Sequence, residues 1–156
     1  MNSRKTPRGI RNNNPGNIDF NKRQFDRDKW VGELGVENHT SPRFTTFSKP
    51  VYGIRALCKT LLTYHRYRKA ADGSAIDTVQ EVIDRWAPPI ENNTNSYAAH
   101  VRDLLDVETG EEIDIEAPDT LMVLAKSIIS HECSGFEYDP EILADGVQMA
   151  LAKGAS

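Results

Sequence analysis

The chain has 156 residues, of which 38% are hydrophobic and 27% are charged, with 10 glycines and 8 prolines. This length suits one compact domain with its own core, and the composition excludes a disordered or collagen-like protein. The net charge of −4 is unevenly distributed, because residues 1–30 carry eight basic and three acidic groups while the remainder is acidic. A basic front favours docking on a polyanion, although a solvated terminus is the simpler explanation.

Neither a membrane anchor nor a disulfide framework is expected. The longest apolar run covers only residues 121–125, far short of the roughly 20 residues that cross a bilayer. The first residues lead into polar sequence, so we expect no secretory signal. Cys58 and Cys133 both fall on apolar helical stripes, which favours buried thiols in a reducing compartment.

The chain divides into an irregular first third and a helical remainder. Residues 10–50 are rich in Asn, Gly and Pro, which predicts a small lobe of turns and short strands. We therefore expect a basic arm at 1–9, this lobe at 10–50 and a helical body at 51–153, within a single domain over 1–156. The predicted fold class is mainly α (α+β).

Two helices are predicted in the first half of the helical body. Apolar residues spaced three and four apart predict an amphipathic helix from about 51 to 70, ending near Gly73. Thr78 and Glu81 have the form of a capping box, which predicts a second, short helix up to Pro88. The expected apolar stripes comprise Ile54, Leu57, Cys58, Leu61, Leu62, Val79, Val82, Ile83 and Trp86.

Three further helices follow. Thr94 is the expected cap of the third, Pro118 lies near the start of the fourth, and Gly135 is a suitable stop for it. Asp139 is the expected cap of the fifth, which runs to about residue 152 with Pro140 at its first position. The expected stripes are Tyr97, Ala98, Val101, Leu104 and Leu105; then Leu121, Leu124, Ala125, Ile128 and Ile129; then Ile142, Leu143, Val147, Ala150 and Leu151.

Glu132 is the first candidate for a catalytic acid. The stripe of the fourth predicted helix, which includes Leu121 and Ile128, reaches Glu132 on the same face one turn later. A carboxyl group withdrawn from water keeps its proton to higher pH, as a general acid requires, and a nearby helix C-terminus disfavours the anion further. The alternative is that Glu132 faces solvent or pairs with an arginine.

Residues 11–18 concentrate side-chain amides and turn formers. Amides supply both donors and acceptors, which sugars with hydroxyl and acetamido groups require. Asn14 and Asn17 are therefore candidate substrate contacts, and the alternative is an ordinary turn. Trp86 and Tyr97 offer flat apolar faces for sugar rings, although such aromatics more often belong to a core.

Three further acids are candidates. The segment 88–94 places a proline turn, Glu91, amides and a helix cap in succession, so Glu91 is a second candidate acid and Asn92 a candidate substrate contact. Its alternative role is to end one helix and begin the next. Glu33 and Glu37 are third, because a lobe facing a helical body suits a carboxylate that positions water in an inverting glycosidase.

Other chemistries receive little support. The four histidines lack metal-binding spacing, and no nucleophile elbow or phosphate-binding glycine loop occurs. Cys133 and His131 are two positions apart on a predicted helix and do not face each other. We expect no metal and no organic cofactor.

Five motifs stand out in order over most of the chain. They are Gly9-Ile10-Arg11-Asn12-Asn13-Asn14-Pro15-Gly16-Asn17-Ile18, Trp30-Val31-Gly32, Phe44-Thr45-Thr46-Phe47, Gly53-Ile54-Arg55-Ala56-Leu57 and Trp86-Ala87-Pro88-Pro89 with Glu91-Asn92, Thr94 and Tyr97. Together they resemble the motifs of a family of small bacteriophage and prophage proteins, described as virion structural proteins or lysozyme-like peptidoglycan hydrolases.

A more distant likeness is to lysozyme-superfamily enzymes, including lytic transglycosylases and glucosaminidases. The segment 128–136 resembles the helix that ends in their catalytic glutamate and leads into a small sugar-binding lobe. Here that helix comes late in the chain, so the likeness implies a circularly permuted lysozyme-like domain. Another helix, at about 140–152, follows Glu132 and departs from the pattern.

The resemblance implies an enzyme that cleaves the β-1,4 glycosidic bonds of bacterial peptidoglycan with Glu132 as general acid, acting as a muramidase or lytic transglycosylase. It implies synthesis in the host cytoplasm, followed by association with the virion or release to the periplasm and cell wall. The principal alternative is a non-catalytic virion structural protein that contacts other virion proteins. A nucleic-acid-binding accessory protein is third, and nucleic acid is not expected as a partner.

Overall fold

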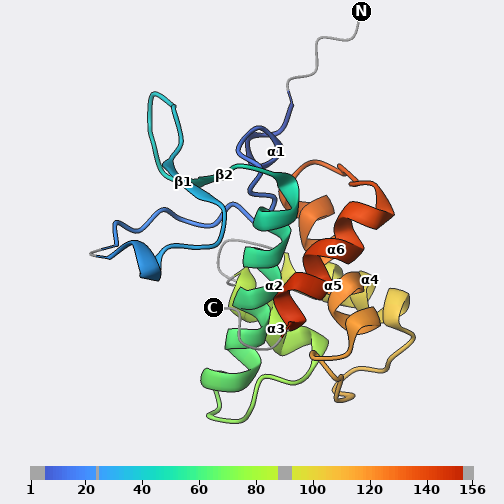
Figure 1. The fold of residues 1–156 in the computed structure, drawn as a ribbon. Coiled ribbons are helices and arrows are strands. Elements are labelled where there is room, and N and C mark those ends of the chain that lie inside the picture. Colours follow the sequence, from blue (N-terminus) through green and yellow to red (C-terminus); the bar gives the residue numbers. More distant parts are fainter. Residues whose placement is uncertain (1–5, 24, 88–92, 153–156) are drawn as a thin grey trace, which may run out of the picture. The chain divides into compact units, whose positions relative to one another are not determined.

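The computed structural model describes residues 6–23, 25–87 and 93–152. Within these residues the protein is mainly α-helical with one small antiparallel sheet (Figure 1), which confirms the predicted fold class. The elements are α1 (Arg8–Arg11), the 3-10 helix η1 (Asp26–Asp28), β1 (Glu33–Val36), β2 (Thr45–Phe47), α2 (Pro50–Tyr67), α3 (Val79–Trp86), α4 (Thr94–Leu105), α5 (Pro118–Glu132) and α6 (Pro140–Leu151).

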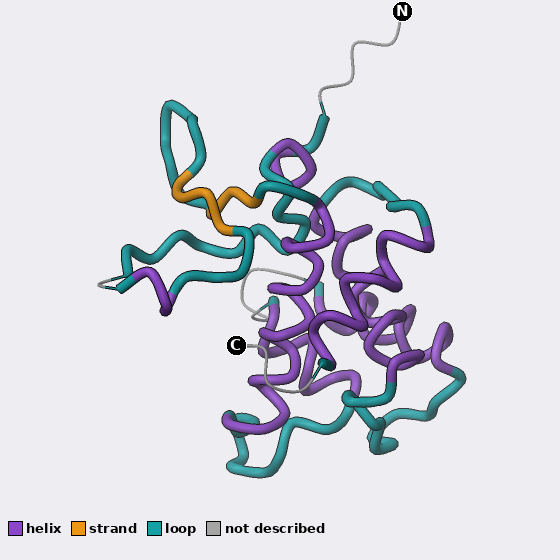
Figure 2. Tube along the Cα trace, in the orientation of Figure 1, coloured by secondary structure: helices purple, strands orange, loops and turns teal. Residues whose placement is uncertain are grey.

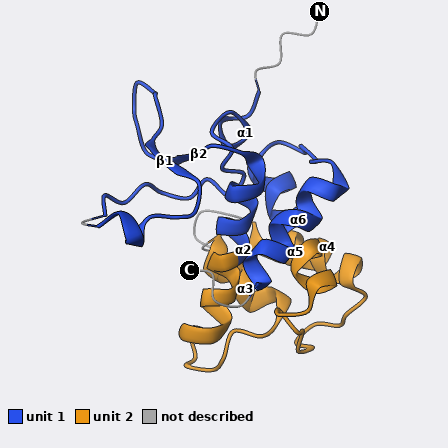
Figure 3. Ribbon diagram, in the orientation of Figure 1, with its two compact units in different colours: residues 1–58, 125–156 blue, residues 59–124 orange. Residues whose placement is uncertain are grey.

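The chain forms two compact units, coloured separately in Figure 3. Unit 1 comprises residues 1–58 and 125–156, and unit 2 comprises residues 59–124. The division falls within α2 and within α5. The interpretation of the whole chain as one lysozyme-like domain stays a prediction.

The lobe of unit 1 is built from short extended segments and loops (Figure 2). Strand β1 pairs antiparallel with β2, and a register shift between Glu33 and Gly35 marks a bulge. On the other edge of β2, Asp19 bridges Phe44. Two loops, around residues 25–30 and 37–43, extend from the strand region (Figure 1). The predicted lobe of turns and short strands is therefore present.

Within unit 1, the first part of α2 and helix α6 approach closely because α6 carries a glycine at their contact. A Cβ atom placed on Gly146 would lie 2.4 Å from the side chain of Ile54, so no larger residue fits there without a shift. Along α5, Ala125 and Ile128 are buried as predicted. Asp139 accepts a hydrogen bond from the Glu141 amide and caps α6, also as predicted.

Unit 2 confirms the second predicted helix and corrects details of the third. Thr78 and Glu81 form the complete capping box of α3. The cap of α4 is Asn93, which accepts from the Ser96 amide, and Thr94 is the first helical residue instead. Leu104, predicted on the buried stripe, is exposed, because the buried face of α4 already ends at Val101.

Other differences are small. Helix α2 ends at Tyr67 rather than near residue 70, and Ile142 in the first turn of α6 is exposed rather than buried. The four-residue helix α1 was not predicted, because it is too short for a hydrophobic period to show. Cys58 and Cys133 are free and buried, as predicted. Among the described residues, no helix is long and apolar enough to cross a membrane.

Candidate functional site

The site is built on the asparagine turn, which we define as residues 12–17 of unit 1. The turn follows α1 directly, and Asn12 forms the C-cap of that helix. Asn13 and Asn17 adopt left-handed backbone conformations, with φ of 53° and 49°. Asparagine tolerates this region better than other non-glycine residues because its short side chain can bond locally. The composition of the turn is therefore partly set by its backbone.

Most of the asparagine amides bind the lobe itself. Asn13 Nδ2 donates to the Phe47 carbonyl at 3.0 Å. Asn14 Nδ2 donates to the carbonyls of Ile18 at 3.0 Å and Thr45 at 2.9 Å, and its Oδ1 accepts from the Ile18 amide at 3.0 Å. Because Asn14 is fully buried, this geometry favours a structural role over the predicted contact with a sugar.

Glu37 is the centre of a second network in the lobe. Arg8 Nε and Nη2 donate to its two carboxylate oxygens at 2.8 and 2.5 Å. Asn12 Nδ2 and the amides of Arg43 and Phe44 also donate to it, at 3.0, 3.0 and 2.9 Å. The Arg8 contact, followed by these N–H donors, holds the pKa of Glu37 well below its ordinary value. Five donors and 4% exposure favour a structural carboxylate over one that positions water.

Glu132 lies where the asparagine turn meets the end of α5. Asn17 Nδ2 donates to Glu132 Oε2 at 3.1 Å across 115 positions of sequence. Glu132 is the last residue of α5 and is half-buried, one turn beyond the buried Ile128. The left-handed residues Ser134 and Gly135 then end the helix, and the Gly135 amide donates to the Ser130 carbonyl at 2.8 Å.

A second contact joins the same two segments one residue further along. The buried Cys133 thiol donates to the Pro15 carbonyl, with a sulfur to oxygen distance of 3.4 Å. Gly9 lies against both segments, since a Cβ placed there would be 2.9 Å from Asn17 Oδ1 and 3.0 Å from Cys133 Sγ. Burial raises the pKa of the Cys133 thiol to about 11. This cysteine is therefore a neutral donor rather than a nucleophile.

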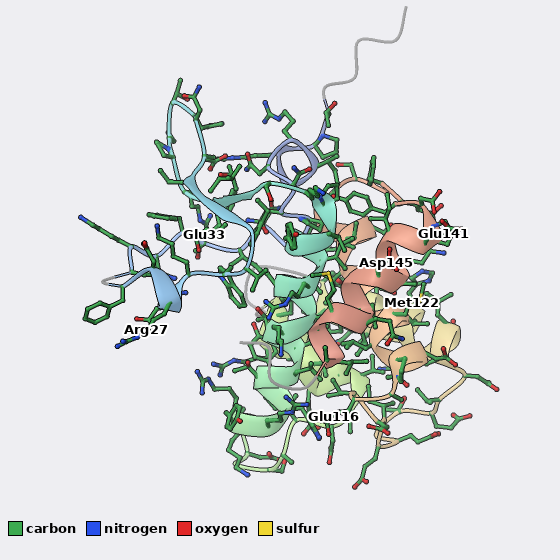
Figure 4. All side chains as sticks on the ribbon, in the orientation of Figure 1. Arg27, Glu33, Glu116, Met122, Glu141 and Asp145 are labelled. Carbon is green, nitrogen blue, oxygen red and sulfur yellow. The ribbon has the colours of Figure 1, made fainter. Side chains whose placement is uncertain are left out.

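The other predicted site residues are distributed over the chain. Glu33 opens β1 in unit 1 (Figure 4) and accepts from the Trp30 amide at 3.1 Å. Trp86 and Tyr97 belong to unit 2. The rings of Trp86 and Tyr64 pack there in a T-shaped arrangement with 6.4 Å between centroids, and Tyr97 is buried. The predicted acid Glu91 and its neighbour Asn92 lie outside the described residues.

Sequence reasoning missed the residues that assemble this site. Arg8 anchors Glu37, and Gly9 leaves room for the junction between Asn17 and Cys133. In the sequence, Gly9 begins one of the motifs noted above, and Arg8 directly precedes that motif. Among the described residues, no group of three or more His, Cys, Asp or Glu side chains is placed to hold a metal. The described part of the site is thus a half-buried carboxyl group held by an amide.

Comparison with known proteins links the chain to a bacteriophage. It is 34% identical over 110 residues to Protein P5 of Pseudoalteromonas phage PM2. The match covers 70% of this chain and 62% of the length of that protein. No protein-family model matches the chain. The phage relationship expected from the motifs is supported, whereas nothing in these comparisons indicates a lysozyme-like family.

Proposed function

We propose that the protein is a phage-derived glycosidase that cleaves the β-1,4 bonds of the peptidoglycan glycan strand, with Glu132 as general acid. The observation that supports this most is the hydrogen bond from Asn17 to Glu132. It places a helix-terminal glutamate against the small lobe within unit 1. In the permuted lysozyme-like interpretation, the lobe and the glutamate helix lie far apart in the sequence and must meet in the fold. The hydrogen bond is such a meeting point.

In the proposed reaction, protonated Glu132 donates its proton to the glycosidic oxygen while the bond from that oxygen to the anomeric carbon breaks. The half-buried position of Glu132 at the C-terminal end of α5 suits this role. A carboxyl group that is held in one orientation and is still partly exposed can reach a glycosidic oxygen.

The anomeric carbon can then react with water or with the 6-hydroxyl of the same sugar. The outcome depends on whether Glu33 is placed to accept a proton from water. If Glu33 accepts a proton from an attacking water, the bond is hydrolysed with inversion. If no carboxylate is placed for this, the 6-hydroxyl of the same sugar attacks, its proton returns to Glu132, and an anhydro sugar forms. Glu33 is the better candidate of the two lobe carboxylates, because Glu37 is buried and paired with Arg8.

The proposed substrate is an anionic polymer, which the basic residues among 1–30 would attract by long-range electrostatics. Asn92 remains a proposed sugar contact and Glu91 an alternative proposed acid. Trp86 and Tyr97, which belong to unit 2, remain proposed sugar contacts of that unit by itself. The enzyme would act from the virion on entry, or after release to the cell wall. Neither setting requires a metal or an organic cofactor in this mechanism.

A virion structural protein is the second candidate function. It is favoured by the phage relative and by apolar side chains on the exposed face of β1. Leu34 is 69% exposed and Val36 is 45% exposed. Contacts with other virion proteins would cover such a face.

A peptidoglycan turbidity assay with wild type, Glu132→Gln and Glu141→Gln tests the proposal. Glu141 is an exposed acid on α6 of the same unit (Figure 4), so its substitution is a matched control for loss of one negative charge. We expect wild type and Glu141→Gln to clear the suspension, and Glu132→Gln to lose at least about a hundredfold in rate. Circular dichroism verifies that all three proteins are folded.

The other outcomes are equally informative. Clearing by wild type and Glu132→Gln alike would assign the acid to another residue. Clearing by none of the three would favour the structural role. Mass spectrometry of the products separates the two reactions, because an anhydro product is one water lighter than a hydrolysis product. Glu33→Gln should abolish hydrolysis if Glu33 positions water.

A further inference from the structure

We propose that Asn17 is a positioning residue that fixes the carboxyl group of Glu132, rather than a residue that contacts the sugar. Its catalytic meaning rests on the proposed function, but the coupling between the two side chains does not. Asn17 Nδ2 donates to Glu132 Oε2 at 3.1 Å. This contact fixes the torsion of the carboxyl group and directs a proton on Glu132 to the other oxygen.

The burial of the Asn17 amide argues against a role in binding sugars. Asn17 Oδ1 has essentially no exposed surface, and it has no hydrogen-bond partner among the described residues. An amide that bound a sugar would present this oxygen to hydroxyl groups. A buried carbonyl oxygen without a partner costs free energy. The Nδ2 group of the same side chain donates to Glu132. The side chain is therefore oriented inward, toward the end of α5.

The backbone around Asn17 is held in place independently of Glu132. The backbone N–H of Asn17 donates to the backbone carbonyl of Asn14 at 3.0 Å. The side chain of Asn14 is in turn hydrogen-bonded inside the lobe. On the other segment, Cys133 bonds to Pro15. The turn thus contacts two successive residues at the end of α5. Such a double contact gives the acid a fixed position before any substrate binds, which is the requirement for efficient proton transfer.

Asn13 provides a matched control within the same turn. Both Asn13 and Asn17 have positive φ, and both donate from Nδ2 to an oxygen across a long sequence separation. The acceptor of Asn13 is a backbone carbonyl, which does not titrate, whereas the acceptor of Asn17 is a carboxylate. Glycine is tolerated at positive φ, so substitution of either asparagine by glycine removes the amide without straining the backbone.

Side-chain amide NMR of the full chain tests the coupling without any need for activity. The Asn17 and Asn13 cross-peaks are assigned by their disappearance in Asn17→Gly and Asn13→Gly. We expect the Asn17 cross-peak to shift with pH as Glu132 ionises, and to lose this response in Glu132→Gln. The Asn13 cross-peak should show no such dependence on Glu132. An Asn17 cross-peak whose pH response is the same in wild type and Glu132→Gln would overturn the proposal.

Kinetics on soluble glycan-strand fragments separate positioning from binding. We expect Asn17→Gly to lower kcat by about ten- to a hundredfold with little change in KM, whereas Asn13→Gly changes kcat much less. Asn17→Asp should lower kcat in the same way, because aspartate cannot donate the hydrogen bond that Asn17 makes to Glu132. If Asn17→Gly raises KM and leaves kcat unchanged, Asn17 binds the substrate, and the inference is wrong.

The two arms distinguish the possible failures. If the Asn17 cross-peak responds to Glu132 but wild type cleaves no glycan, the proposed function fails and the coupling stands. If wild type cleaves glycan but the cross-peak shows no coupling, the function stands and the positioning role of Asn17 is wrong.

Discussion

The asparagine turn of unit 1 and the start of α3 in unit 2 organise polar side chains in opposite ways. At α3, the Thr78 amide and hydroxyl both donate to Glu81 Oε1, at 3.1 and 2.9 Å, within three positions of sequence. In the turn, Asn12 reaches Glu37 over 25 positions and Asn17 reaches Glu132 over 115. The first device forms from local sequence alone, whereas the second exists only when distant segments have met.

This difference predicts unequal sensitivity to mutation. A local cap contributes to one helix, so its loss costs little and affects only that segment. The asparagine turn contacts β2, α2 and the end of α5, so all three segments depend on it. Substitutions in the turn or against it should therefore cost more free energy of unfolding, and affect more of unit 1, than substitutions at the start of α3.

The largest effect is expected for Gly53→Ala. Alanine is favoured over glycine inside a helix by about 1 kcal/mol, yet the new Cβ would lie 1.8 Å from the backbone oxygen of Asn13. Backbone atoms cannot move aside cheaply, so overpacking outweighs propensity, and we expect a net loss of about 3 kcal/mol. Urea unfolding measures it, with Gly73→Ala as control.

Gly73 has a φ of +87° but nothing within 4 Å of an added Cβ. Only backbone strain applies there, and we expect a loss of about 1 kcal/mol. Equal losses of unfolding free energy in Gly53→Ala and Gly73→Ala would show that the contact of α2 with the asparagine turn is not tight. The asparagine turn would then be no more sensitive to mutation than the start of α3.

Glu37→Gln should have the second largest effect. Glutamine keeps the shape of the side chain but replaces one acceptor oxygen by a donor, which would face donors from Arg8, Asn12, Arg43 or Phe44. We expect a loss of about 2 kcal/mol at neutral pH. Chemical denaturation of wild type and variant measures the difference, and a value near zero would contradict the structural assignment of Glu37.

The pH dependence of the same pair sharpens this test. The pKa of Glu37 is lowered in the folded state from about 4.3 in the unfolded chain. The contribution of Glu37 to the free energy of unfolding is therefore fully present above the unfolded-state pKa and is lost as the pH falls below it. In unit 2 the pKa of Asp77 is raised by burial and by the nearby carboxylates of Glu112 and Glu81, so acidification relieves a cost there. The difference between wild type and Glu37→Gln should shrink below about pH 4.

Thr78→Ala should have the smallest effect of the three. It removes the side chain that accepts from the Glu81 amide, and loss of such a cap costs about 1 kcal/mol. Hydrogen exchange should show faster opening of the first turn of α3 with little change in unit 1, and Thr78→Ser should restore protection. Deprotection of the asparagine turn by Thr78→Ala would contradict the local character of this cap.

The five long helices were predictable because each carries its own signals. Hydrophobic period, the Thr78 capping box and Asp139 with Pro140 act within a few residues, and these interactions are as readable in sequence as in the structure. The errors lie at ends and margins, as at Asn93 and Leu104. There the choice between neighbouring caps, or between burial and exposure, depends on packing.

The site was less predictable, and the asparagine run shows why. Its residue types indicated a turn or a sugar contact equally well, and the sequence offered no means to separate Asn14, which is fully buried in the lobe, from Asn17, which reaches Glu132. Glu33 and Glu37 looked alike as acids near a tryptophan. In the structure, the hydrogen bonds that Glu37 accepts from Arg8, Asn12 and two backbone amides distinguish it from Glu33.

The sequence by itself determined the helices, the irregular lobe and the register that brings Glu132 to the end of a buried stripe, because these follow from spacing along a single segment. The tertiary structure alone decided which asparagine meets Glu132, which glutamate is paired with arginine, and where a glycine must leave space. Those outcomes depend on distances between residues up to 118 positions apart, and no local preference of the chain encodes them.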